Sequence, residues 1–476
     1  MPQFANLLEF FSLLSLDPRM KPDTIACYVF ADTFSNATVG PADAQYNALA
    51  AENWSRTASG SPTCIFQPSS VVELQAAVPI IVEANASFAI RSGGHMPVPY
   101  AATIDEGILI DLSKFGDTRY DAENNVVVIG AGQRWGDVYP ELDPYEVTIV
   151  GGRVLSPGVG GLILGCGLSY LSDLYGLVCD NVANFEVILA DGSLVNANEE
   201  SNSDLYWALK GGRNNFGIVT AFTLRTYPIF HIWGDALAEF QTNPEKDPYA
   251  QLNMNTYVTN TTFGVVLGLT YLKPEESPAA FSPFYRLEET WNTVLDTTRL
   301  RTIHNLISEY PIPEIPRIEW TTTSFKPSKS LYKSVREIFA ASPTVDKMKK
   351  LTAGTGIFTL QGVSSRAVKA GKLHGGNALG LEPVAQTWFH TDIGWWFPED
   401  DDIAHNAIRS LTDEVEAAAK SQGNYLRYLF MNDASIDQRV VEHYGQENVK
   451  KLTEVRNKYD PGAVFQRLVP GGFKLL

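Results

Sequence analysis

The sequence is short of positive charge. Its 476 residues include 37 Lys and Arg against 54 Asp and Glu, a formal net charge of −17 at pH 7. A surface of this sign repels phosphate backbones, so we expect no nucleic-acid partner. A long lipid-facing helix is lacking as well. Residues 154–172 carry no charge, but their five glycines and one proline are unsuited to such a helix, and we expect no membrane span.

Metal-binding patterns are also absent. The four cysteines form no C-x-x-C pair and the seven histidines form no H-E-x-x-H, so no metal site is predicted. The acidic run 399–402 precedes a stretch with apolar residues at helical spacing, 403–411. Carboxylates interact favourably with the dipole at a helix start, so we interpret this run as a solvated helix N-terminus.

Three common catalytic or nucleotide-binding fingerprints are missing. Gly130, Gly132 and Gly136 follow a strand, but their spacing is G-x-G-x-x-x-G, and the next strand, 147–152, brings no acidic residue for a ribose. These features exclude nicotinamide binding. No P-loop motif occurs. Residues 167–171 come nearest to a G-x-S-x-G nucleophile elbow and lack the final glycine, which argues against a serine hydrolase.

The first half of the chain predicts alternating strands and helices with glycine at the turns. Ser70 and Glu73 form a capping box ahead of an apolar-periodic helix, which Pro79 should kink or shorten. Asp191 and Gly192 lie between two alternating apolar strands and predict a hairpin. Hydrophobic residues make up 45% of the chain, as in a compact globular protein, and its length favours two domains.

The pattern changes after Pro228. Strands at 262–272 and 384–397 are interleaved with polar helical patterns at 281–301 and 403–421. We therefore expect an inserted second domain within an α+β protein. The predicted division is 1–228 for the first part of one domain, 229–423 for the insertion and 424–476 for the segment that returns to the first domain.

Glycine is concentrated in three segments, 91–95, 157–167 and 211–217. Backbone without Cβ atoms approaches a ligand closely and offers N–H donors to phosphate. Three such segments in one half of the chain indicate a large bound group with a pyrophosphate and a planar ring. Because the chain is acidic, we expect backbone dipoles and few cations to hold the phosphates.

These segments resemble a known family. The similarity to the FAD-linked oxidases of the vanillyl-alcohol-oxidase type, in the fungal form of the branch of berberine bridge enzyme and 6-hydroxy-D-nicotine oxidase, is carried by "AIRSGGH", "GVGGLILGCGLSYLSDLYGLVCDNV", "FEVILADG", "DLYWALKGGRNNFGIVT" and "NKYDPGAVFQ". It is strong over residues 60–228 and good over 424–476. The resemblance implies a two-domain PCMH-type FAD-binding fold, with an inserted substrate domain built on an antiparallel sheet covered by helices.

The resemblance also implies how the cofactor is held. The histidine of the family's R-x-G-G-H motif is bonded to the 8α-methyl carbon of FAD, and it corresponds to His95 here. The other cofactor-binding positions carried over from the family are Arg91, Ser92, Gly93, Gly94, Pro157, Gly158, Gly160, Gly161, Gly165, Gly167, Leu168, Gly176, Asn181, Val182, Gly217, Ile218, Val219 and Asn432.

The chain departs from the family at three places. Many relatives have a second flavin link through a cysteine, whose position is Val154 here, so we predict a single histidyl link. Pro157 replaces a valine or leucine that tunes oxygen access to the flavin, which leaves oxidase and dehydrogenase behaviour both open. A catalytic tyrosine near the C-terminus is replaced in the segment 430–433, "FMND".

The function that the resemblance implies is flavin-dependent oxidation of a small organic substrate, such as a secondary metabolite. A hydride would pass to flavin N5, a base would take a proton, and O2 would accept the electrons to give H2O2. Asp433, Tyr428 and His390 are the candidates for the base. The alternatives are a flavin-containing cyclase or pericyclase without net oxidation, a dehydrogenase with poor O2 reactivity, and a flavin-binding protein without turnover. We expect a monomer or dimer.

The cysteines and sequons bear on localisation. Cys27 and Cys64 flank a region where secreted relatives form a disulfide, although two buried free thiols remain an alternative. Cys166 stands where relatives have glycine, and we expect it to be buried. Together with Asn-x-Ser/Thr sequons such as those at Asn36 and Asn53, these features favour the secretory route or a vesicle over the cytoplasm.

Overall fold

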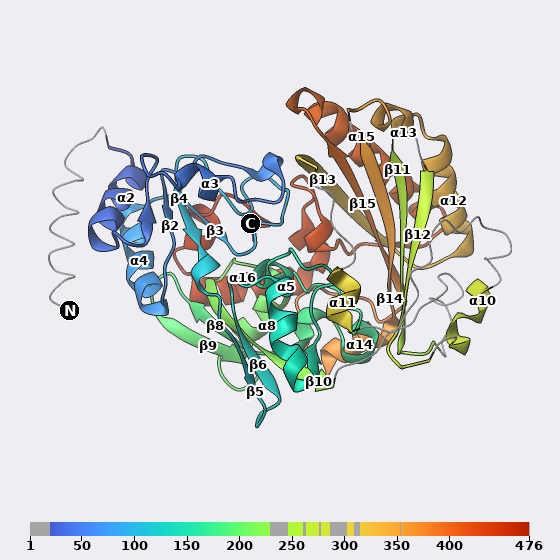
Figure 1. Ribbon diagram of the computed structural model, residues 1–476, viewed down its shortest axis with the longest axis horizontal. Coiled ribbons are helices and arrows are strands. Elements are labelled where there is room, and N and C mark those ends of the chain that lie inside the picture. Colours follow the sequence, from blue (N-terminus) through green and yellow to red (C-terminus); the bar gives the residue numbers. More distant parts are fainter. Residues whose placement is uncertain are drawn as a thin grey trace.

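The computed structural model describes residues 20–228, 246–259, 263–275, 278–285, 302–308, 315–352 and 354–475. Two of the sheets in this part of the chain share one hydrophobic core, and a third forms a second core with its own helices. Figure 1 shows the third sheet on one side of the molecule and the first two on the other. This mixture of helices and sheets confirms the predicted α+β class. No described helix combines the length and apolar character that crossing a membrane requires.

The first sheet has the strand order β1-β2-β4-β3, with β2 and β3 parallel to β4. A disulfide between Cys27 and Cys64 joins helix α2 to β2, which settles the pairing left open by the sequence. The elements of this region are α2 (Pro22–Thr33), β1 (Thr38–Val39), α3 (Tyr46–Ala50), β2 (Cys64–Phe66), α4 (Val71–Ala84), β3 (Phe88–Arg91) and β4 (Ile108–Asp111).

Helix α4 begins as the sequence predicts but does not shorten. Ser70 Oγ accepts the backbone N–H of Glu73 at 3.3 Å, so the predicted N-cap is present. Pro79 was expected to kink or shorten the helix; it does not shorten it, because α4 continues to Ala84. Pro79 leaves the carbonyl of Gln75 without its helical N–H partner. That carbonyl faces Gly192, where a Cβ would lie only 2.5 Å away.

The second sheet is antiparallel, with the order β5-β6-β10-β8-β9 and β7 paired to β10. The predicted hairpin is confirmed as β8–β9, and Gly192 in its turn has φ +80°. The elements are β5 (Thr118–Asp121), β6 (Val126–Gly130), α5 (Trp135–Leu142), β7 (Val147–Ile149), α6 (Val159–Leu164), α7 (Ser172–Tyr175), β8 (Val182–Ile188), β9 (Leu194–Asn198), α8 (Ser203–Gly212), β10 (Ile218–Pro228), α16 (Gln446–Tyr459) and α17 (Val464–Arg467).

The third sheet is also antiparallel, in the order β12-β11-β14-β15-β13-β16. Helices α12, α13 and α15 cover one of its faces (Figure 1). The elements are β11 (Ala250–Thr259), β12 (Phe263–Tyr271), α10 (Ser282–Tyr285), α11 (Ile303–Ser308), β13 (Arg317–Phe325), α12 (Lys329–Ala341), α13 (Pro343–Met348), β14 (Thr355–Val363), α14 (Ser365–Lys372), β15 (Gln386–Trp395), α15 (Asp401–Ser421) and β16 (Tyr425–Leu426).

These elements test the patterns read in the second half of the sequence. The helix predicted at 403–421 is confirmed as α15, and the acidic run lies at its start. Most of the helical pattern at 281–301 lies outside the described residues. Strand β16 still pairs with β13, so the chain leaves the third sheet just after the boundary expected near 424. The division of the chain into domains stays a prediction.

A buried ion pair joins the last residues of the neighbouring strands β3 and β4. Arg91 Nη2 and Asp111 Oδ2 are 2.9 Å apart, and both side chains are 2% exposed. Arg91 Nη1 also donates to the carbonyl oxygen of Leu49 at 2.8 Å. Both charges therefore depend on one another, because water cannot reach either.

We expect Arg91→Met to lower the free energy of unfolding by about 3–5 kcal/mol, since the substitution leaves the buried carboxylate of Asp111 unpaired. Urea denaturation measures this loss. The double variant Arg91→Met, Asp111→Asn should recover part of it by removing the second charge. A loss below about 1 kcal/mol for the single variant, as for an exposed pair, would contradict a role for the buried pair.

Candidate functional site

A cavity lies where the first two sheets meet the third. About 1430 Å³ of space lies between its walls, the open mouth included. The walls come from all three predicted glycine segments, from β13 and from the C-terminal region. The predicted residues among those that line it are Ser92, Gly93, Gly94, His95, Pro157, Gly158, Gly160, Gly161, Gly167, Leu168, Gly217, Ile218, Val219, Asn432 and Asp433.

Two of the glycine segments lie against each other at the base of the cavity. A Cβ on Gly93 would lie 2.3 Å from the backbone nitrogen of Gly158, and a Cβ on Gly158 would lie 2.3 Å from that of Gly93. Gly94 has φ +60°, a conformation that residues with a Cβ rarely adopt. The backbone at this contact is therefore compatible only with glycine.

His95 follows this turn and lines the cavity. Its ring stacks on Trp54 with centroids 4.3 Å apart, and Nε2 lies 3.0 Å from Ser156 Oγ. Burial lowers the pKa of His95 to about 4, and the nearby Arg134 guanidinium contributes to this lowering. The imidazole is thus neutral at neutral pH and keeps a nitrogen lone pair available for bond formation.

Asn432 packs against the second glycine segment. It belongs to the short helix η7 (Met431–Asp433), and its Nδ2 donates to the carbonyl oxygen of Leu162 at 3.3 Å. A Cβ on Gly165 would lie 2.0 Å from Asn432 Oδ1, so the absence of a Cβ at Gly165 makes room for this amide. Arg213 Nη2 donates to the same Oδ1 at 3.2 Å. The predicted Gly165 thus supports the wall without lining it.

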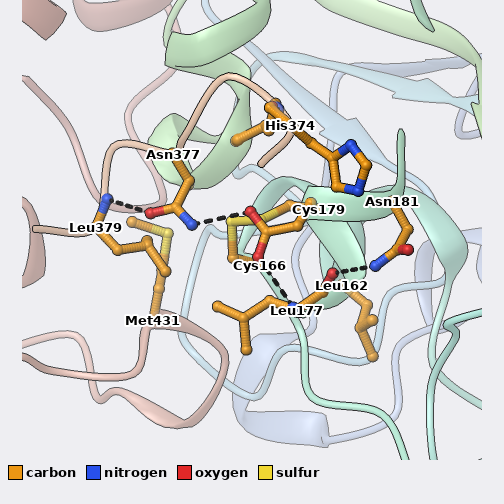
Figure 2. The surroundings of a disulfide bond; sticks show 12 residues. Leu162, Cys166, Leu177, Cys179, Asn181, His374, Asn377, Leu379 and Met431 are labelled. Atoms are coloured by element: carbon orange, nitrogen blue, oxygen red, sulfur yellow. Dashed lines mark hydrogen bonds between the residues drawn. A yellow bond between two sulfur atoms is a disulfide. The ribbon is translucent and has the colours of Figure 1, made fainter. Parts of the chain in front are cut away.

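A second disulfide bonds this glycine segment to a residue further along the chain. Cys166 is buried, as expected, but it is bonded to Cys179, a pairing that the sequence did not predict (Figure 2). Cys166 has φ +53°, consistent with a position that relatives fill with glycine. Asp180, next to Cys179, accepts hydrogen bonds from Leu177 N and Asn377 Nδ2 at 3.0 and 2.9 Å. The disulfide therefore joins the second glycine segment to the hydrogen-bonded turn around Asp180.

The third sheet presents a polar face to the cavity. Along β15 the side chains of Phe389, Ile393 and Trp395 enter the core shared with the covering helices. Since neighbouring residues of a strand point to opposite faces, His390 and Asp392 lie on the other face. In the strand register Trp320 of β13 is opposite Asp392. Trp320 lines the cavity, with its ring centroid 5.9 Å from that of His390.

A chain of polar contacts connects this face of the third sheet to Arg153, which precedes the second glycine segment, and to Asp433. Arg153, which lines the cavity, donates to Gln361 Oε1 of β14. Gln361 Nε2 donates to Asp433 Oδ2 at 2.7 Å. His390 lies between two carboxylates, with Nε2 3.0 Å from Asp392 Oδ2 and Nδ1 3.5 Å from Asp433 Oδ2. Among the described residues, Asp433 is the carboxylate that lines the cavity.

The three base candidates occupy different environments. Burial by itself lowers the pKa of His390, but the carboxylates of Asp433 and Asp392 outweigh it and raise the net pKa above the usual value. Tyr428 is buried against Trp388, away from the cavity lining, and burial raises its pKa well above the usual value. The structure therefore brings Asp433 to the cavity, places His390 behind it and leaves Tyr428 in the core.

Four other predicted cofactor residues do not line the cavity. The guanidinium of Arg91 is committed to Asp111, as described above. Gly176 has φ +90° and a Cβ there would lie 3.0 Å from Asp180 Oδ2, so it serves a turn. Asn181 Nδ2 donates to the carbonyl oxygens of Tyr175 and Leu177 at 3.0 and 2.8 Å. Val182 begins β8 and is buried in the core.

Several cavity residues were not predicted from the sequence. Trp320, Arg153 and Arg213 line the cavity, and Trp54 stacks on His95. Trp54 directly follows Asn53, whose buried side-chain amide has no hydrogen-bond partner in the described part of the chain. A buried amide is a poor position for glycosylation, so the structure does not favour this sequon. Arg213 lies within the predicted glycine segment 211–217, although its own role was not predicted. No local pattern marked the other three residues, because they reach the cavity from separate strands and loops.

The comparisons with known proteins agree with this arrangement. Residues 62–198 match the family model described as an FAD binding domain. The bifunctional solanapyrone synthase of Alternaria solani is 36% identical over 468 residues, covering 95% of this chain and 89% of the relative. The fold is similar to that of 6-hydroxy-D-nicotine oxidase from Arthrobacter nicotinovorans, with a TM-score of 0.73, 20% identity and coverage of 92% and 97% of the two chains.

A third similar protein is described as carrying a doubly linked flavin. It is the glucooligosaccharide oxidase of Acremonium strictum, with a 6-S-cysteinyl, 8α-N1-histidyl FAD. The TM-score is 0.72 at 17% identity, covering 95% of this chain and 99% of the neighbour. At this identity the likeness concerns the fold alone.

Fold and site together define a flavin-dependent oxidoreductase. The chain belongs to the family of FAD-binding enzymes that includes the bifunctional solanapyrone synthase. The residues present fit FAD: the wall at Gly93 and Gly158 excludes Cβ atoms, and the buried indole N–H of Trp320 has no partner among the described residues. The residues that the structure describes include no cluster of three His, Cys, Asp or Glu side chains suited to a metal ion.

We expect Gly93→Ala to lower stability by about 1–3 kcal/mol and to reduce the bound flavin, because its Cβ forces two backbone segments apart. Thermal unfolding and the ratio of flavin to protein absorbance measure both effects. Gly161→Ala is the matched control for stability, since its Cβ meets no atom within 4 Å. Equal losses of stability in the two variants would show that the close contact is not required.

Proposed function

We propose that this protein carries FAD bonded to His95 and oxidises a small organic substrate, in the class of secondary metabolites. The bound flavin would accept a hydride at N5 from a substrate C–H bond, and O2 would then take the electrons and form H2O2. The observation that carries the proposal is the neutral His95 imidazole, which follows a glycine-only turn in the wall of the cavity. The histidyl link described for the oxidase of Acremonium strictum supports it.

A single link fits the residues of this chain. Val154 lines the cavity at the position where relatives carry the second, cysteinyl link. A valine side chain offers no atom that forms such a bond. The four cysteines are all paired in the two disulfides. His95 is therefore the residue that we expect to hold the flavin covalently.

Asp433 is the group that we propose as the base. Its carboxylate lines the cavity, and Gln361 holds one of its oxygens at 2.7 Å. His390 lies behind this carboxylate, and the carboxylates of Asp433 and Asp392 raise the pKa of its imidazole, which favours the charged form that would pair with Asp433. A substrate hydroxyl placed beside Asp433 would give up its proton there as the hydride leaves the adjacent carbon. His390 acts through Asp433 in this scheme and is a positioning residue.

Cyclisation without net oxidation is a second candidate. The relative from Alternaria solani is described as a bifunctional synthase, and the walls of the cavity here include apolar residues such as Leu164, Phe222 and Trp320. Such walls would fold a flexible precursor into a reactive shape. A product of the same mass as its substrate, formed without peroxide, would favour this candidate. Turnover that proceeds only with an artificial electron acceptor would identify a dehydrogenase.

The remaining features of the proposal concern organisation and location. Residues 1–228 and 424–476 would hold FAD, and 229–423 would hold the substrate. We expect a monomer or dimer. Two disulfides in the described structure are typical of an oxidising compartment, so we propose the secretory route or a vesicle as the location.

Acid precipitation tests the proposed covalent bond between FAD and His95. The wild-type pellet should be yellow, and His95→Ala should give a colourless pellet with flavin in the supernatant, because the covalent bond is lost. The control is His443→Ala, which changes a histidine outside the cavity and should leave the pellet yellow. A colourless wild-type pellet would refute the tether.

The choice of base is tested by comparing two variants in an assay of peroxide release. Asp433→Asn should lower turnover by about 10²–10⁴-fold, the usual effect of losing a general base. Tyr428→Phe should leave turnover within about twofold, since its hydroxyl lies away from the cavity without a partner among the described residues. The reverse result would assign the base to Tyr428.

A further inference from the structure

Two cationic side chains, one of them in the cavity wall, have nitrogen atoms shielded from solvent. The Nε of Arg213 and the Nζ of Lys474 are shielded from solvent and have no hydrogen-bond partner in the described part of the chain. Arg213 lines the cavity, as do its neighbour Asn214 and the nearby Gly472. Uncompensated buried charges are rare, because removing an ion from water costs several kcal/mol. Two shielded cations without a carboxylate partner are unexpected in a chain with a net charge of −17.

The surroundings offer these cations little negative charge. Arg213 Nη2 donates to the neutral amide of Asn432, and its guanidinium lies 5.6 Å from the ring centroid of Phe473. The carboxylate that influences Lys474 is Asp460, whose two oxygens already accept the backbone N–H groups of Val464 and Phe465 at 2.9 Å. No described ion pair includes Arg213 or Lys474.

The side chain of Asn215 ties the segment that contains Lys474 to the turn that contains Arg213. Asn215 Nδ2 donates to the carbonyl oxygen of Phe473 at 3.0 Å, and Asn215 Oδ1 accepts the backbone N–H of Leu475 at 3.3 Å. The segment with Lys474 is thus fixed beside the turn with Arg213, which has φ +53°. Burial lowers the pKa of Lys474 to about 7, and the charge of Arg213 contributes to this lowering. The ammonium is therefore destabilised until an anion approaches.

We propose that Arg213 and Lys474 form an anion site that receives a negatively charged part of the flavin nucleotide. This inference rests on FAD binding in the cavity. FAD carries anionic oxygens on its pyrophosphate, and its ring system gains negative charge on reduction. Either source supplies the charge that the pair lacks. The site would add two cations to the backbone dipoles that we expect to hold the phosphates.

The test compares Lys474→Met with its parent in a His95→Ala background, where flavin binding is reversible. Titrations with FAD and with riboflavin separate the two sources, because riboflavin has no phosphate. If the pyrophosphate occupies the site, the Kd for FAD should rise about tenfold and that for riboflavin should not change. If the reduced ring occupies it, the midpoint potential should fall by about 30 mV for each tenfold loss of stabilisation.

Two control variants accompany this test. Lys450→Met removes a positive charge from a side chain that is 79% exposed, and it should change neither the Kd nor the potential. Lys474→Arg keeps the charge and should bind FAD within about threefold of the parent. If Lys474→Met matches Lys450→Met in both readouts, the anion site is refuted even though FAD binds. Failure of the His95→Ala parent and of the wild type to bind FAD would instead refute the proposed function.

Unfolding of the flavin-free protein distinguishes a binding role from a structural one. Replacing an unpaired buried ammonium by Met removes a desolvated charge, so flavin-free Lys474→Met should be at least as stable as its parent. A variant that loses both stability and flavin would show that Lys474 supports the fold. That outcome would overturn the proposal.

Discussion

The structure of the site depends on one close contact between two stretches of backbone. Gly93 and Gly158 approach so closely that neither position has room for a Cβ, and this contact brings the turn before His95 against the start of α6. Both stretches border the same cavity. Close packing of this kind leaves no slack, so the position of His95 follows from the path of the main chain more than from its own side-chain contacts.

The third sheet has two faces of different character. One face of β15 packs Phe389 and Trp395 against helices, and the opposite face directs His390 towards Asp433. An alternating strand thus separates a stable core from a polar wall within a few residues. The contact between Arg153 and Gln361 connects this wall to the segment that precedes α6, so the geometry of the proposed base depends on how the third sheet packs against the first two.

The sequence predicted features that neighbouring residues determine, and it did not predict contacts between segments that are far apart in the chain. The glycine segments and His95 were predicted to bind the cofactor, and most of these residues line the cavity because a short motif specifies its own backbone. Their contact with the cofactor stays a prediction. Arg91 belongs to the same motif, yet its side chain points to Asp111, since family membership does not give side-chain direction. Trp320 and Arg153 come from segments that no pattern marked, and they reach the cavity only in the folded chain. Four cysteines permit three pairings, so the bond between Cys166 and Cys179 also required the structure.

The wide spread of the cavity residues along the chain has a consequence for biosynthesis. Ile90 and Gly472 line the same cavity, although hundreds of positions separate them. Contacts of such long range form late, because the loop between them must close first. The disulfides span only 37 and 13 positions and are free to form earlier. A nascent polypeptide would therefore be oxidised at its thiols before it is competent to capture a nucleotide.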